Sequence, residues 1–156
     1  MGSLYDSDLV AWSAEQARVI REAGRQRVNA PIDWENVAEE IESLGKSERR
    51  TLSSRIRTVI EHLLKLQVSS AIDPVAVWLD TIQRTREEIA EILADSPSLR
   101  REVPEMVARQ LKVAQRFVLA NLAYHGETPL KPLEAITFDE GTILGDWLPD
   151  RAPPLA

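Results

Sequence analysis

The sequence has 156 residues, of which 44% are hydrophobic, and a formal net charge of −6 at neutral pH. This length predicts a single domain, residues 1–156, and the absence of cysteine excludes disulfide bonds, thiolate metal sites and cysteine catalysis. The negative charge disfavours nonspecific binding to nucleic acid or to anionic membranes. The N-terminal stretch MGSLYDSDLV lacks the regions of a signal peptide, and no apolar run approaches the roughly 18 residues that a membrane span needs. We therefore expect a cytoplasmic protein with no membrane segment.

Apolar residues recur at intervals of three and four, the period of an α-helix, and no segment alternates with the period of a strand. The pattern predicts an all-α fold, a helical bundle of about four main helices. The first helix is expected to begin near Asp6 or Ser7, either of which can cap it, and to run to about Gly24. Its inward-facing residues would be Leu9, Trp12, Gln16, Val19 or Ile20, and Ala23.

The second helix is expected over about Trp34 to Val68, because one apolar stripe keeps its direction along the whole segment. The stripe consists of Trp34, Val37, Ile41, Leu44, Leu52, Ile56, Val59, Leu63 and Leu66. The apolar stripe keeps the same direction before and after Gly45. We therefore expect one continuous helix, about 50 Å long at about 1.5 Å per residue. The alternative is two helices, with a turn at Gly45 and with Ser47 as the second cap. One long helix exceeds what a compact domain requires, so it favours a homodimer or a protein partner that covers its stripe.

The third helix is expected to begin at Asp73-Pro74, a cap followed by proline at the first helical position, and to end at Asp95-Ser96-Pro97. The fourth is expected to begin after Ser98 and to end at Gly126, with Pro104 marking a kink or the start of its regular part. The inward-facing residues of these two helices would be Trp78, Ile82, Thr85, Ile89 and Ile92 or Leu93, and then Leu99, Val103, Met106, Gln110, Val113 or Ala114, Phe117, Asn121 and Tyr124.

Residues 126–156 are expected to form an irregular, Pro-rich tail on a helical core of residues 1–125. One helical turn is predicted in this tail, near Asp139 to Leu144. Trp147 and Leu148 are expected to hold the tail against the body of the protein.

A cluster of carboxylates opens the second helix. Glu35, Glu39 and Glu42 share one face, as an acid–base or metal site would require, but this face is nearly opposite the apolar stripe. We therefore expect these three side chains to face water. Asp33 is a plausible cap for the same helix, where acids favour the positive end of its dipole.

Glu40 differs because it points to the edge of the stripe, and Glu48 and His62 follow on that same edge. Carboxylates and imidazole bind metals and transfer protons, so these three residues are the candidate catalytic residues, although we assign no metal and no cofactor. A continuous helix would place Glu40 and His62 about 33 Å apart, so only another helix or subunit could complete a site. The structural interpretation is that His62 is a hydrogen-bonded boundary histidine. His125, beside Gly126, is expected at a helix C-terminus.

Lys46, Arg50 and Arg57 share the outward side of the second helix and could contact phosphates. The basic run contains no aromatic residue for base stacking, and Glu42 can pair with Lys46, so nucleic acid is disfavoured as a partner. The standard nucleotide-binding, hydrolase and zinc-protease motifs are absent. The four tryptophans are expected to share one core and not to form a ligand cage; they are Trp12, Trp34, Trp78 and Trp147.

Four segments carry a resemblance: LYDSDLVAW at 4–12, NVAEEIESLGKSERR at 36–50, EHLLKLQ at 61–67 and DSPSLR at 95–100. In order and spacing they resemble the bacterial domain of unknown function 29 family, which is found largely in cyanobacteria and proteobacteria. The resemblance implies an all-helical protein and supplies no reaction, substrate or cofactor. The best-matching residues are Tyr5, Asp8, Trp12, Glu39, Glu40, Ile41, Leu44, Gly45, Glu48, Arg49, His62, Leu63, Leu64 and Pro97.

The leading hypothesis is a non-enzymatic, cytoplasmic interaction or regulatory module that forms a homodimer or binds a protein partner through its second helix. The second hypothesis is a metal-dependent or acid–base enzyme that uses Glu40, Glu48 and His62 between helices or subunits. Nucleic-acid binding through Lys46, Arg50 and Arg57 is the third.

Overall fold

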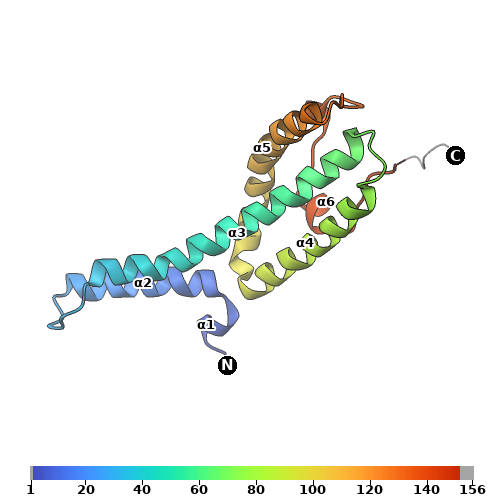
Figure 1. The fold of residues 1–156 in the computed structure, drawn as a ribbon. Helices are drawn as coiled ribbons and strands as arrows, with labels where there is room; N and C mark the ends of the chain where they lie inside the picture. Colours follow the sequence, from blue (N-terminus) through green and yellow to red (C-terminus); the bar gives the residue numbers. More distant parts are fainter. Residues whose placement is uncertain (1, 152–156) are drawn as a thin grey trace. The chain divides into compact units, whose positions relative to one another are not determined.

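The computed structural model describes residues 2–151 (Figure 1). Within this range the backbone forms six α-helices, two 3-10 helices and no strand, which confirms the all-α prediction. The elements are α1 (Leu4–Ser7), α2 (Leu9–Arg25), α3 (Trp34–Val68), α4 (Val75–Asp95), η1 (Pro97–Glu102), α5 (Val103–Tyr124), η2 (Leu133–Ala135) and α6 (Glu140–Leu144). No helix of the described range is both long enough and apolar enough to cross a bilayer.

The described residues fall into two compact units. The first unit contains residues 2–52 and 91–101, and the second contains residues 53–90 and 102–151. The organisation of the chain as one domain stays a prediction.

In the first unit, α2 lies beside the first part of α3, and small residues fill the seam between the two helices (Figure 1). Ser13 and Ala17 of α2 are buried, as is Ala38 of α3. A Cβ atom at Gly45 would lie only 2.8 Å from the Ser13 Oγ. Gly45 therefore serves the close approach of α2, and α3 continues through it, so the alternative of a turn at Gly45 with Ser47 as a cap is wrong.

The α2 residues that were predicted to face inward lie beside the seam and not in it. Val10, Ser13 and Ala17 are the buried residues of α2, in place of the predicted stripe that begins with Leu9 and Trp12. The larger apolar side chains stay partly exposed because two helices in close contact have room only for small side chains between them. The prediction identified the apolar side of α2 correctly but named the wrong residues on it as buried.

The capping of the first helices also differs from the prediction. Ser3 and Asp6 form a capping box on the short helix α1, and Asp8, not Asp6 or Ser7, caps α2 by accepting a hydrogen bond from the Ala11 amide at 2.8 Å. Asp8 also accepts bonds from the Ser98 amide at 2.7 Å and the Ser98 hydroxyl at 2.9 Å. One carboxylate thus joins the start of α2 to η1.

The core of the second unit confirms the predicted stripes of α3 and α4. Ile56, Val59 and Leu63 of α3 are fully buried, and so, almost completely, are Ile82 and Ile89 of α4. Two further α3 residues, Ile60 and Leu64, are fully buried as well. The α3 stripe is therefore wider here than the single line that the sequence suggested.

The fourth helix was expected to begin after Ser98, but Pro97–Glu102 is the 3-10 helix η1. The regular helix α5 begins at Val103, so Pro104 marks the start of its regular part, one of the two predicted roles. It ends with His125 as its C-cap, as expected.

The later inward-facing residues of α5 were predicted only in part. Ala114 is buried, as one of the two predicted alternatives at its position. Phe117 and Tyr124 are exposed, and Val118 and Leu122 are buried in their place. Buried residues that are spaced by four shift by about 40° around the helix at each step. The predicted inward-facing residues kept a constant direction instead, so they came to lie beside the buried ones.

The tail of the second unit contains η2 and α6, and α6 confirms the predicted helical turn. Its buried anchors are Leu133, Ile136 and Ile143, whereas Trp147 and Leu148, the predicted anchors, are each 44% exposed. Arg86 of α4 adds a polar anchor, donating to the carbonyls of Ile143 at 3.0 Å and of Thr142 and Trp147 at 2.8 Å. Residues 152–156 of the predicted tail lie outside the described residues.

Candidate functional site

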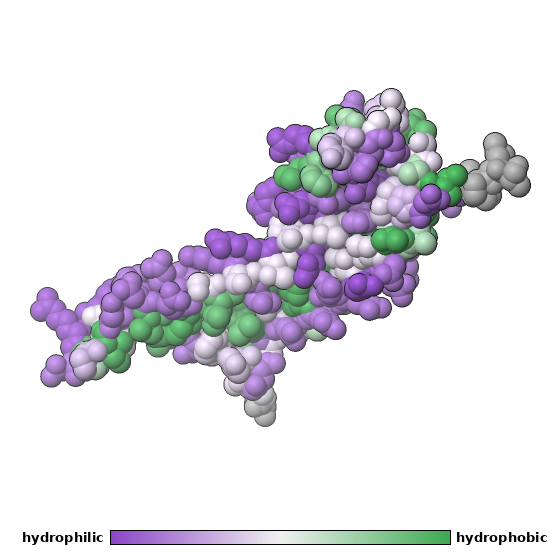
Figure 2. All heavy atoms as spheres, viewed as in Figure 1, coloured by the Kyte–Doolittle hydropathy of each residue, from purple (hydrophilic) through white to green (hydrophobic). Residues whose placement is uncertain are grey.

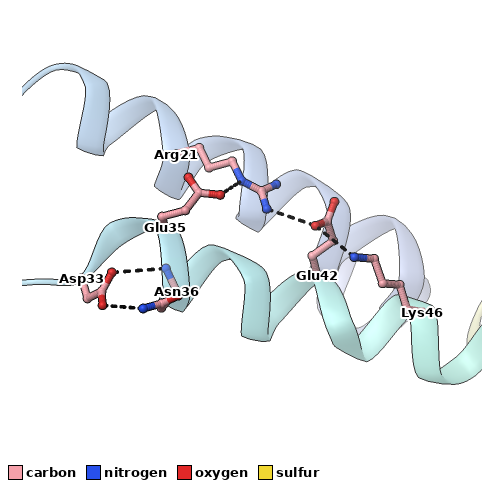
Figure 3. Close-up of polar contacts among 6 residues, drawn as sticks. All are labelled: Arg21, Asp33, Glu35, Asn36, Glu42 and Lys46. Carbon is pink, nitrogen blue, oxygen red and sulfur yellow. Dashed lines mark hydrogen bonds and ion pairs between the residues drawn. The ribbon is translucent and has the colours of Figure 1, made fainter.

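One side of the α2–α3 seam is closed by ion pairs (Figure 3). Arg21 of α2 donates from Nε to Glu35 and from Nη2 to Glu42, both at 3.0 Å. Lys46 lies 3.6 Å from the same Glu42 carboxylate, which confirms the predicted pair. The hydrogen bond from Arg21 lowers the pKa of Glu42, and Lys46 lowers it further. Glu35, whose side chain is 72% exposed, faces water as predicted, although it also pairs with Arg21. Glu42 is only 37% exposed and belongs to the contact between the two helices.

The remaining acids of this stretch behave as predicted. Glu39 is exposed. Asp33 caps α3, accepting bonds from the Asn36 amide at 3.3 Å and from the Asn36 side-chain amide at 2.6 Å (Figure 3). The acidic opening of α3 thus has a structural explanation in capping and in the Arg21 ion pairs.

The opposite side of the seam is apolar. Val37 and Leu44 of α3, both assigned inward by the sequence, are 40% and 44% exposed, and Val19 of α2 is 44% exposed. Ile41 and Trp12 are partly exposed. Figure 2 shows a band of hydrophobic residues running along the α2–α3 hairpin. We call the set Trp12, Val19, Val37, Ile41 and Leu44 the hairpin face.

Helical geometry explains why charge and apolar surface separate across the seam. At 100° per residue, Arg21 lies about 50° to one side of the buried α2 line, whereas Trp12 and Val19 lie about 130° and about 150° to the other side. On α3, Glu35 and Glu42 flank one side of the Ala38 line, while the hairpin-face residues flank the other. The two helices are antiparallel neighbours, so like flanks meet on the same side.

The candidate residues Glu40, Glu48 and His62 lie at separate positions along the single helix α3. No cluster of three or more His, Cys, Asp and Glu side chains suitable for a metal ion occurs among residues 2–151. Glu40 is exposed at the rim of the hairpin face, and Glu48 is half-buried. Both belong to the first unit, whereas His62 belongs to the second.

His62 is a hydrogen-bonded boundary histidine. Its Nδ1 lies 2.8 Å from the Thr58 carbonyl oxygen one turn earlier, so Nδ1 carries the proton in this arrangement. Burial lowers the pKa of His62, and the Thr58 hydrogen bond opposes that shift only in part. Burial also raises the pKa of the adjacent Glu61, which Arg57 contacts at 3.6 Å. These contacts hold side chains on α3 and bring no second ligand to His62.

The basic residues considered for phosphate binding are partly engaged within the chain. Lys46 pairs with Glu42, and Arg57 pairs with Glu61. Arg50 is exposed. Two of the three cations therefore carry a compensating carboxylate, which weakens the case for a phosphate-binding face.

The tryptophans do not share one core, contrary to the prediction. Trp12 packs edge-on against Tyr5 at 4.9 Å between ring centroids, and Trp34 covers Gly24, both in the first unit. In the second unit, Trp78 stacks under the Arg151 guanidinium at 6.0 Å, and Trp147 contacts the ring of Phe138. They mark separate contacts at the ends of helices and in the tail.

Comparison with known proteins assigns the family. The model of the family described as domain of unknown function DUF29 matches residues 4–139. The chain belongs to the DUF29 family. Its DUF29 fold is similar to a crystal structure of an alpha-helical protein of unknown function from Rhodospirillum rubrum, with a TM-score of 0.78 and 22% identity over 92% of this chain and 90% of that one. No curated protein sequence matches this DUF29 chain.

Sequence reasoning missed Arg21, the residue that organises the charged side of the hairpin. Its position on the flank of α2 is visible in the helical periodicity, but its acidic partners lie on α3, so the pattern of α2 alone does not show the pairing. Pairing the flanks of two successive helices would have identified it.

Proposed function

We propose that this DUF29 protein is a non-enzymatic, cytoplasmic interaction module that self-associates through the hairpin face. The observation that carries the proposal is the exposure of Val37 and Leu44, since the same stripe is fully buried further along α3, at Ile56 and Leu63. A regular apolar stripe that lacks a covering helix within its own unit is typical of an interaction surface. Two hairpin faces laid together would complete a four-helix bundle.

The size of the face supports a second copy as the occupant. Helix α2 has 17 residues. Its length is about 26 Å, and two adjacent helices are about 20 Å wide, so the face measures about 500 Å². Two copies would bury about 1,000 Å² together, the lower limit for a specific interface. We therefore expect a concentration-dependent dimer and not an obligate one.

The ion pairs of the hairpin lie on the side of the seam opposite the hairpin face, so they would not be buried when this face is covered. Arg21, Glu35 and Glu42 satisfy one another on the opposite side of the seam. Burying the hairpin face consequently costs little desolvation of charge, except at its rim, where Glu40 lies.

The test is light scattering coupled to gel filtration over a range of concentrations. The wild-type protein is expected to shift from monomer to dimer as concentration rises, and Leu44→Glu is expected to stay monomeric because it would bury a carboxylate at the centre of the face. Val77→Glu is the matched control, since Val77 is 64% exposed on α4 in the second unit. Circular dichroism of each variant checks that helix content is unchanged.

A wild-type protein that stays monomeric at the highest attainable concentration would overturn the proposal. Equal loss of dimer in Leu44→Glu and Val77→Glu would also overturn it, because association would then not use the hairpin face. Recovery of a one-to-one complex with a different protein, and no dimer, would replace the second copy as occupant.

A further inference from the structure

The second unit contains a cleft of about 680 Å³ between the end of α3, the start of α4 and the tail. Gln67, Lys131 and Arg151 form its polar wall, and Ile72, Leu130 and Trp147 contribute apolar surface. This volume lies within the range of small-molecule sites. The cleft is independent of the hairpin face, which belongs to the first unit.

Two buried donors in the cleft wall lack hydrogen-bond partners. The Nη1 of Arg151 and the Nε2 of Gln67 are both buried and unpaired among the described residues. Leaving a buried donor unsatisfied is unfavourable, and more so when the donor is charged. Two such donors on residues that line one cleft indicate that the cleft has unmet capacity to bind hydrogen-bond acceptors.

The neighbouring contacts hold both side chains in place. The Nη2 of Arg151 donates to the Ser69 carbonyl at 3.0 Å and also to the Ala71 carbonyl, and the guanidinium lies over the Trp78 ring. The Oε1 of Gln67 accepts a bond from Lys131 Nζ at 3.0 Å, which turns its amide so that Nε2 is the free end. The donors are thus oriented before any ligand arrives, which reduces the entropy lost on binding.

The charge of the wall suits an anion. Lys131 and Arg151 contribute two positive charges and Asp150 one negative charge among the lining residues, so the cleft has an excess of one cation. The apolar lining provides for a hydrocarbon body: Ile72 is 58% exposed and Leu130 is 66% exposed.

We propose that this cleft binds a small monocarboxylate with an apolar chain. The carboxylate accepts hydrogen bonds from Arg151 Nη1 and Gln67 Nε2, with Lys131 nearby, and the chain lies against Ile72, Leu130 and Trp147. Both nitrogens are buried in this structure, so binding includes a rotamer change of exposed apolar side chains of the cleft, such as Ile72 and Leu130, while Lys131 keeps its bond to Gln67. Such side chains change rotamer in nanoseconds, so this step does not limit binding.

The test is titration calorimetry of the full chain with sodium octanoate. Octan-1-ol, which has the same chain without the charge, and acetate, which has the charge without the chain, are the matched ligands. We expect octanoate to bind at least about tenfold more tightly than either, because the ion pair and the chain each contribute more than about 1.4 kcal/mol.

Gln67→Leu and Arg151→Lys are the test variants, and Gln83→Leu on the exposed side of α4 is the control. Gln67→Leu is expected to weaken octanoate binding by about tenfold, the effect of one charge-assisted hydrogen bond, and Arg151→Lys by at least as much. Because Arg151 also anchors the tail, Gln67→Leu keeps the test valid if Arg151→Lys unfolds. Equal affinity for octanoate and octan-1-ol, equal affinity for octanoate and acetate, undetectable octanoate binding, or undiminished binding by Gln67→Leu would each overturn the proposal.

Discussion

At the residue scale, Gly45 shows how one position can support two interpretations in the sequence, of which the continuous helix is confirmed. A glycine between an acidic and a basic run indicates a turn as readily as a close contact. In the structure it is buried inside a 35-residue helix, with Ser13 of α2 directly above it. The glycine is needed because Ser13 lies too close for a side chain at this position. A glycine inside a helix is less favourable than alanine by about 1 kcal/mol.

Replacing Gly45 by a large residue should therefore separate the two helices. We expect Gly45→Leu to lower the free energy of unfolding by about 1–3 kcal/mol, as other overpacked substitutions do. Ser47→Leu, on the exposed side of the same helix, should change it by less than about 0.5 kcal/mol. Urea denaturation followed by circular dichroism measures both. Identical midpoints for wild type and Gly45→Leu would show that α2 does not approach α3 at this glycine.

At the element scale, Asp8 connects local and long-range structure. It caps α2 through the Ala11 amide and binds the amide and hydroxyl of Ser98 in η1. Burial by itself raises the pKa of Asp8, but the hydrogen bonds from Ala11 and Ser98, with the nearby Arg101, outweigh it, and the pKa lies below the ordinary 3.8. The folded state consequently stabilises the charged carboxylate.

A lowered carboxylate pKa fixes the sign of the pH dependence. The stability from Asp8 is fully present above its unfolded-state pKa and is lost as the pH falls through the folded-state pKa. We expect Asp8→Ala to lower the free energy of unfolding by about 1–2 kcal/mol at neutral pH, the usual value of a lost cap. The gap between variant and wild type should narrow in acid, below the ordinary aspartate range.

Urea denaturation at neutral pH and again below the ordinary pKa of 3.8 measures this effect. Asp80→Ala is a suitable control, because Asp80 is an exposed residue that pairs with Arg84 on the same helix. A difference between Asp8→Ala and wild type that is independent of pH would contradict a role for the ionised carboxylate.

At the scale of the whole molecule, the sequence predicts helices better than it predicts their contacts. Helical periodicity predicted the continuous α3, and the cap and proline signals at Asp73-Pro74 and Asp95-Ser96-Pro97 predicted the bounds of α4. Both kinds of signal are local properties of one segment. The small-residue seam, the exposed Phe117 and the Arg21 ion pairs depend on which neighbour a helix meets, and one segment does not contain that information. For the same reason, periodicity placed Val37 and Leu44 in a core when they belong to a surface.

The predicted dimer has a further consequence that depends on the charge of the whole molecule. Each copy carries a net charge of −6, and Glu40 lies at the rim of the hairpin face. Bringing two copies together therefore creates like-charge repulsion, which salt screens over a Debye length of about 8 Å at 0.15 M ionic strength. The dimer should tighten as salt increases, opposite to an interface held by ion pairs.

Glu40→Gln should tighten the dimer about two- to fivefold at low salt and reduce its salt dependence, since exposed charge interactions amount to about 1 kcal/mol or less. Sedimentation equilibrium at low and high salt measures the dissociation constant. Glu134→Gln removes the same charge from an exposed position in the second unit, so it separates local repulsion at the rim from the effect of net charge. If both variants tighten the dimer equally, Glu40 is remote from the interface and the hairpin face is not the surface that associates.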